Sequence, residues 1–90
     1  MKRDYDNPVY RKLRYRTLTR DKRCCQMPGC DTKKPLHVHH IRPWSISAHL
    51  RFDPDNLITL CKSCHESIKG QEHIYEPLFM GIVRRNANNS

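Results

Sequence analysis

The sequence predicts an α+β fold in one small domain, from three observations. Ninety residues are enough for one domain and too few for two. Two short apolar runs and then a stretch without Gly or Pro give the order strand, loop, strand, helix in the middle of the chain, and further helices are predicted near both ends. Only 37% of the residues are hydrophobic, so the core is marginal. We therefore expect disulfide bonds or a bound metal ion to stabilise the fold.

A basic helix is predicted from about residue 8 to residue 22. Asn7 followed by Pro8 is typical of an N-cap and a first helical position. Val9, Leu13 and Thr17 share one side of it. Cations crowd the other sides: Arg11, Lys12, Arg14, Arg16, Arg20, Lys22 and Arg23. Such a face is either solvated or follows the phosphates of a nucleic acid.

The middle of the chain predicts two strands and a short helix. Residues 36–41 alternate as a strand does, and a turn at residues 53–56 precedes the apolar run 57–60, a second strand. A short helix is expected from Ser63 to about Lys69, with Gly70 ending it.

The last helix is predicted over about residues 77–85, because Pro77 is favoured at a first helical position. Its packing stripe is Leu78, Phe79, Ile82 and Val83. The polar end, residues 86–90, is expected to fray. Residues 1–90 are thus predicted to form a single domain.

Two close cysteine pairs predict that a metal ion stabilises the fold. Cys25 and Cys30 flank the turn Met27-Pro28-Gly29, and Cys61 and Cys64 are separated by two residues. Zinc prefers four tetrahedral soft ligands, and each tight turn can present two thiolates to one ion. The sequence therefore predicts a structural Zn²⁺ on Cys25, Cys30, Cys61 and Cys64.

Other uses of the cysteines are less favoured. Cys24 can replace Cys25 at a longer spacing, so that choice stays open. Cys61 to His65 has the CxxCH form of c-type haem attachment, which requires export and leaves Cys25 and Cys30 unused. An odd number of cysteines and no apolar signal segment argue against a secreted disulfide framework. We expect a cytoplasmic protein without a membrane span.

The charge predicts a polyanionic partner. Lys plus Arg is 17 against nine acids, a formal net charge of +8. Four thiolates and one Zn²⁺ change this to +8 − 4 + 2 = +6. Small basic domains commonly bind nucleic acid, although charge also serves solubility.

Histidines gather where the zinc would draw the chain together. His39 and His40 end the first predicted strand, and His65 follows Cys64. With both cysteine pairs on one ion, His39 and His65 can share a second metal ion, and His40 can point beside it. His37 has the same strand parity as His39, so it lies near this site or pairs with a carboxylate. We expect structural roles for His49 and His73, and a core position for Trp44.

Three segments resemble the signature of the HNH endonuclease family, embedded between two zinc-binding cysteine pairs. They are Val38-His39-His40-Ile41-Arg42-Pro43, Asn56-Leu57-Ile58-Thr59-Leu60-Cys61 and Cys64-His65. The segment from Arg20 to Gln26 also resembles the one that commonly precedes the signature. The resemblance to the family covers about residues 19–70, which we expect to form the core of the domain. The family implies a ββα-metal fold, and the predicted strands and helix lie in the same places.

The resemblance implies roles for single residues. His39 and His65 take the positions of the metal ligands, His40 that of the general base, and Asn56 that of the central Asn, which pins the loop and orients the base. Many relatives carry a third metal-side His or Asn where this chain has Lys69, which cannot ligate while protonated. A neutral imidazole can take the proton of the attacking water near pH 7. A divalent cation, Mg²⁺, Mn²⁺, Ni²⁺ or Zn²⁺, stabilises the departing oxygen, and two imidazoles favour the softer ions.

The leading hypothesis is therefore a metal-dependent DNA endonuclease that leaves 5′-phosphate and 3′-hydroxyl ends. The alternative is a non-catalytic zinc module that binds nucleic acid, which has no use for the His and Asn set. By analogy with small phage proteins, packaging proteins such as the terminase are further partners and the bacterial host cytoplasm is the location. We expect a monomer or weak dimer. The DNA-contact candidates are Arg14, Arg16, Arg20, Arg23, Arg42, Lys62 and Lys69.

Overall fold

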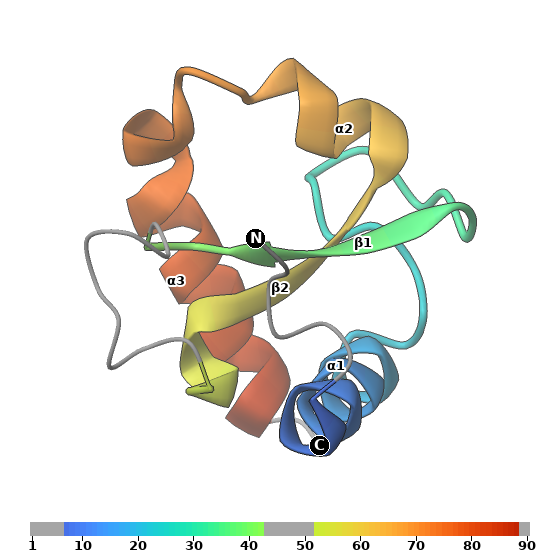
Figure 1. Ribbon diagram of the computed structural model, residues 1–90. Coiled ribbons are helices and arrows are strands. Elements are labelled where there is room, and N and C mark those ends of the chain that lie inside the picture. Colours follow the sequence, from blue (N-terminus) through green and yellow to red (C-terminus); the bar gives the residue numbers. More distant parts are fainter. Residues whose placement is uncertain (1–6, 43–51, 89–90) are drawn as a thin grey trace.

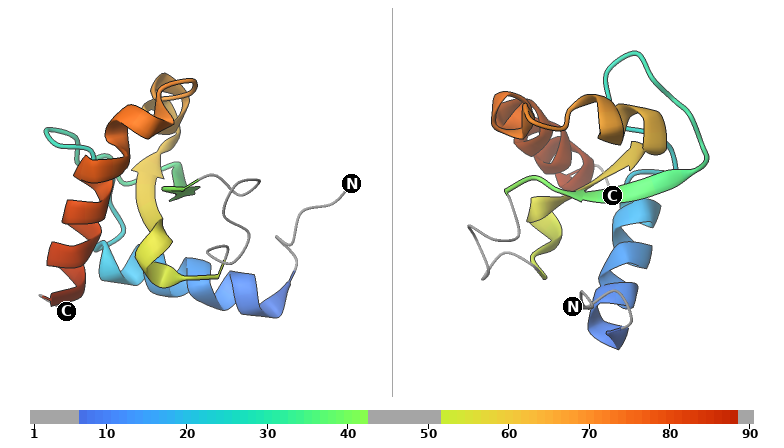
Figure 2. Two further views of the ribbon diagram at one scale, coloured as in Figure 1. Left: turned by 90° about the vertical axis from the view of Figure 1, so that its left-hand side faces the viewer. Right: turned by 45° about the horizontal axis from the view of Figure 1, so that its top comes forward.

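A two-stranded antiparallel sheet lies between helices in the computed structural model, which describes residues 7–42 and 52–88 (Figure 1). Helix α1 (Pro8–Arg20) lies on one side of strand β1 (Leu36–His40), and helix α2 (Lys62–Ser67) lies on the other. The 3-10 helix η3 (Pro54–Asn56) leads directly into strand β2 (Leu57–Cys61). Figure 2 shows helix α3 (Glu72–Asn88) running alongside β2, with α1 lying across the end where η3 stands.

The register of the sheet places the histidine-bearing strand beside the start of α2. β1 and β2 pair antiparallel, with Leu36 opposite Cys61 and His40 opposite Leu57. Helix α2 begins at Lys62, directly after the last residue of β2, so the position of β2 fixes the position of α2. The observed order is β1, β2, α2, and the predicted α+β class is confirmed.

The core forms on β2 and the inner face of α3. All five residues of β2 are buried, as in a strand that is covered on both faces. The main cluster includes two of the cysteines: Cys25, Ile41, Ile58, Leu60, Cys61, Ile68, Phe79, Ile82 and Val83. Among the described residues, no helix combines the length and apolar character needed to cross a membrane.

The first helix starts as predicted and ends earlier. The side chain of Asn7 accepts a hydrogen bond from the amide of Val9 at 2.8 Å, which confirms the N-cap. The predicted end at residue 22 is wrong, because Lys22 and Arg23 adopt positive φ (58° and 53°) and close the helix after Arg20. Val9 is 56% exposed and Tyr10 is 2% exposed, so Tyr10 takes the place predicted for Val9 in the buried stripe.

The last helix differs more from its prediction. It begins at Glu72 and not at residue 77, so Pro77 lies inside it. An interior proline removes one helical hydrogen bond, and the burial of Phe79, Ile82 and Val83 offsets that loss. The predicted fraying is not seen over residues 86–88, which belong to α3, and the side-chain amide of Asn86 donates to Asp21 Oδ1 and Gln26 Oε1, both at 2.9 Å.

A buried carboxylate joins three elements. The side chain of Asp21 is fully buried and accepts hydrogen bonds from Arg20, from the backbone amide of Thr59 in β2 at 2.9 Å, and from Asn86 in α3. The guanidinium of Arg20 also donates to the backbone carbonyls of Pro54 and Leu57. This network fastens the end of α1 to η3, β2 and α3.

Replacement of Asp21 by Asn is therefore expected to lower the free energy of unfolding by about 3–5 kcal/mol. The amide NH₂ would face donors that now meet a carboxylate oxygen, and Arg20 would lose its counter-charge. Urea denaturation of the metal-loaded protein measures the loss. Asp31→Asn is the matched control, because Asp31 is exposed, and we expect a change within about 0.5 kcal/mol. An unchanged urea midpoint for Asp21→Asn would contradict the structural role.

Candidate functional site

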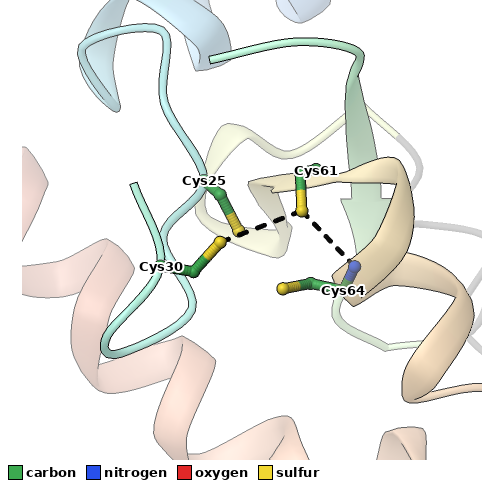
Figure 3. A group of neighbouring side chains, drawn as sticks. All are labelled: Cys25, Cys30, Cys61 and Cys64. Carbon is green, nitrogen blue, oxygen red and sulfur yellow. Dashed lines mark hydrogen bonds between the residues drawn. The ribbon is translucent and has the colours of Figure 1, made fainter. Parts of the chain in front are cut away.

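Two turns bring four cysteine side chains to one point. Cys30 follows the predicted turn, in which Gly29 has φ +84° and the amide of Cys30 donates to the carbonyl of Met27 at 2.9 Å. Cys61 ends β2 and caps α2, and its sulfur accepts from the amide of Cys64 at 3.4 Å. The side chains point toward one another from these two segments (Figure 3). Their sulfur atoms all lie within 4.8 Å of one another.

The cysteine cluster fits a tetrahedral metal ion. With Zn–S bonds of about 2.3 Å, neighbouring sulfurs around zinc lie about 3.8 Å apart. The sulfurs of Cys30 and Cys61 are 3.9 Å apart. The sulfur of Cys24 lies outside the cluster and contacts the carbonyl of Asp21 at 3.5 Å, so the cluster contains Cys25 and not Cys24.

The thiols of the cluster differ in their electrostatic surroundings. Hydrogen bonding to Thr32 lowers the pKa of Cys30 to about 6. Burial raises the pKa of Cys25 and of Cys64. Deprotonating all four thiols thus needs a cation at their centre, which is the condition under which structural metal sites form.

A second cluster consists of three imidazoles on the face of β1 that meets α2. The ring centroids of His39 and His65 are 5.2 Å apart. His37 also lies 5.2 Å from His65, and the two Nδ1 atoms are 3.0 Å apart. The strand–helix junction after Cys61 therefore brings the predicted metal ligands His39 and His65 together, with His37 beside them.

The His39 ring is held in a form suited to metal binding. It is 6% exposed, packs edge-on against Phe79, and its Nε2 has no hydrogen-bond partner among the described residues. Burial lowers the pKa of His39 to about 4. The pKa of His65 is also lowered, mainly by burial and to a lesser extent by the charge of His37. Both rings are neutral near pH 7, and a buried, unpartnered imidazole nitrogen is the donor that a divalent cation needs.

His40 lies on the opposite face of β1, as the alternation of a strand requires. Its ring stacks on the buried ring of Tyr10 in α1, with centroids 6.1 Å apart and planes 10° apart. Tyr10 thus fixes the plane of the predicted base. The sequence signal for Tyr10 was its spacing from Leu13 and Thr17, three and seven residues on, which matches one helical stripe.

Asn56 pins the backbone that follows His40. It is 2% exposed, and its Oδ1 accepts from the amide of Arg42 at 2.9 Å while its Nδ2 donates to the carbonyl of Arg42 at 3.3 Å. Its own carbonyl accepts from the amide of Ile41 at 2.8 Å. Through both atoms of its side-chain amide, Asn56 therefore holds the backbone at Arg42 in place.

A pocket runs past the edge of β1 that faces away from β2. It has a volume of about 250 Å³ and is lined by Tyr10, Arg14, Leu36, His37, Val38 and His65. Tyr10, the stacking partner of His40, stands at one side and the His37–His65 pair at the other. The pocket is therefore bounded by α1, β1 and the start of α2, with the guanidinium of Arg14 at its wall.

The structure removes Arg20 from the predicted DNA-contact residues. All three guanidinium nitrogens of Arg20 donate to Asp21 or to backbone carbonyls, and the side chain is 11% exposed, so Arg20 belongs to the fold. Arg23 lies over the Tyr15 ring at 5.2 Å, and Arg42 pairs with Glu76 at 3.5 Å. The remaining candidates are exposed: Arg14, Arg16, Arg23, Arg42, Lys62 and Lys69.

The remaining residues singled out in the sequence are either exposed or outside the described residues. His73 is exposed on α3 and Lys69 is exposed after α2. Pro43, Trp44 and His49 lie outside the described residues.

The middle of the chain matches a family model. Residues 23–71 match the model described as HNH endonuclease, and the matched segment spans both cysteine pairs and every residue of the histidine cluster. Comparison with curated proteins and with solved structures finds no match.

Proposed function

The chain belongs to the HNH endonuclease family, and from this premise we propose that it hydrolyses phosphodiester bonds of DNA. The observation that carries the proposal is that the rings of His39 and His65 lie 5.2 Å apart, while the buried Nε2 of His39 has no hydrogen-bond partner among the described residues. His40 stands on the other face of the same strand and stacks on Tyr10, which lines the pocket together with His65.

The proposed reaction assigns one role to each group. His40 takes a proton from a water molecule, the water oxygen bonds to phosphorus, and the bond from phosphorus to the 3′-oxygen breaks. The leaving oxygen takes a proton from solvent, so the products carry a 5′-phosphate and a 3′-hydroxyl. Asn56 holds the backbone after His40, and Tyr10 fixes the plane of its ring. His39 and His65 would hold a divalent cation (Mg²⁺, Mn²⁺, Ni²⁺ or Zn²⁺), which would supply positive charge to stabilise the leaving oxygen.

Zinc is the proposed occupant of the cysteine cluster. Four thiolates with tetrahedral spacing suit Zn²⁺ better than a hard cation that prefers oxygen ligands. Cys64 is followed directly by His65, so an ion in this cluster also fixes the second imidazole of the histidine site.

The proposed DNA grip uses the exposed cations around the pocket. Arg14 lines the pocket, and Arg16 and Arg23 continue from it along and beyond α1. Lys62 begins α2, Lys69 follows that helix, and Arg42 follows β1. Such contacts hold phosphates and do not read bases, so we propose cutting with little sequence preference.

The biological setting is proposed by analogy. A chain with one histidine site cuts one strand per event, so a monomer nicks and a double-strand break needs a weak dimer or a second encounter. In a bacteriophage the protein would act in the host cytoplasm beside packaging proteins such as the terminase. A non-catalytic zinc module is the alternative function, supported by the cysteine cluster and the net charge of +8.

Plasmid relaxation distinguishes the two functions. We expect zinc-loaded protein to convert supercoiled plasmid first to the open circle on addition of Mg²⁺, Mn²⁺ or Ni²⁺, and to leave it supercoiled when no second ion is added. Agarose gels measure the conversion, and gel-shift experiments measure DNA binding under the same conditions. Retained DNA binding with a supercoiled plasmid in every ion would establish the non-catalytic module instead.

A further inference from the structure

His37 and His65 approach each other more closely than a packing contact requires. His37 comes from β1 and His65 from α2, and their Nδ1 atoms are 3.0 Å apart with the ring planes at 90°. Both side chains are half-buried and line the pocket at the strand edge. Two ring nitrogens with their lone pairs facing at this distance repel each other unless a proton or a cation lies between them.

The separation suits one cation shared by both rings. Bonds from a metal to imidazole nitrogen measure about 2.0–2.1 Å, so two ligands at a right angle stand about 3.0 Å apart. The observed 3.0 Å matches this value. The pocket beside the pair leaves room for water or a phosphate oxygen at further positions of the same ion.

The site also needs a third protein ligand. Lys69, one turn beyond His65, is exposed and carries an ammonium that has no lone pair to donate. His39 and His65 alone would give a weak site with only two neutral ligands. His37 is on the same face of β1 as His39, two residues away, and its nitrogen already lies beside that of His65.

We propose that His37 is a direct ligand of the catalytic divalent cation, sharing the ion with His65 through Nδ1 next to His39. This inference rests on the proposed nuclease function and adds a ligand to its metal site. Imidazole ligands make the site prefer Mn²⁺, Ni²⁺ or Zn²⁺ over Mg²⁺, because nitrogen ligands suit the later transition metals.

Ni²⁺ binding by the zinc-loaded full chain tests the proposal. In isothermal titration we expect His37→Ala to weaken Ni²⁺ binding more than about 100-fold, beyond the roughly 10- to 100-fold typical of a residue that only orients a ligand. His37→Asn is the decisive variant, because its Oδ1 replaces Nδ1 as a hydrogen-bond acceptor but is a poor ligand for Ni²⁺. We expect His37→Asn to lose affinity as His37→Ala does. Wild-type affinity in His37→Asn would reduce His37 to a hydrogen-bond partner and overturn the proposal.

Controls separate this result from misfolding and from failure of the nuclease function. His73→Ala removes an exposed histidine and should bind Ni²⁺ as the wild type does. Zinc content and the circular dichroism spectrum establish that each variant is folded. A crystal with Ni²⁺ should show anomalous density about 2.1 Å from Nδ1 of both His37 and His65. Density on His65 alone overturns the ligand assignment, and a wild type that binds Ni²⁺ but never relaxes plasmid overturns the nuclease proposal instead.

Discussion

Replacing Cys61 by serine is expected to unfold the domain and abolish DNA cutting together. Cys61 is 3% exposed, lies in the core cluster and caps α2, so its loss affects packing as well as metal binding. The apparent free energy of a structural zinc site is about 10–16 kcal/mol. This equals or exceeds the total stability of about 5–15 kcal/mol typical of a domain, so we expect the protein to unfold without the proposed ion.

The loss of activity has a reason separate from the loss of stability. The proposed zinc would hold Cys64, and Cys64 lies in the first turn of α2, directly before the His65 that faces His39. Zinc content, circular dichroism and plasmid relaxation measure metal binding, folding and DNA cutting on one preparation. Cys24→Ser is the matched control, because Cys24 lies outside the cluster, and it should keep zinc, fold and activity. A Cys61→Ser protein that stays folded and active would refute the coupling of the two sites.

His40→Ala is expected to slow DNA cleavage by about 10²- to 10⁴-fold, the usual contribution of a general base. The fold should survive, because His40 is half-buried, lies at the end of β1 and belongs to neither the core cluster nor the cysteine cluster. Cleavage rates at saturating Mn²⁺ or Ni²⁺ measure the effect, with DNA affinity determined in parallel by gel shift.

The same experiment separates catalysis from binding. Affinity for DNA and for Ni²⁺ should change little in His40→Ala, since His40 lies on the face of β1 away from His39 and His65. His73→Ala, which removes an exposed histidine of α3, should cut at the wild-type rate. If His40→Ala also cuts at that rate, a different group removes the proton from water.

Local chemistry made several elements predictable from sequence. Asn7 and Pro8 mark the start of α1 because capping depends only on neighbouring residues. The spacing of two cysteines around a tight turn fixes where both thiols point, so the four members of the cysteine cluster could be named in advance. The HNH signature placed His39, Asn56 and His65, and the family match to residues 23–71 agrees with it.

Only the tertiary structure decided the contacts between distant segments. Arg20 is one of many cations in sequence, and its burial against Asp21 depends on η3 and β2 arriving from residues 54–59. The side chain of Asn86 is held by hydrogen bonds to Asp21 and Gln26, which lie about 60 residues earlier in the chain. No local sequence pattern indicates these contacts. The nearness of His37 to His65 likewise follows from the register of the sheet and the immediate start of α2. Sequence determines what neighbours along the chain can do, whereas long-range packing decides which buried groups have partners and which cations stay free for DNA.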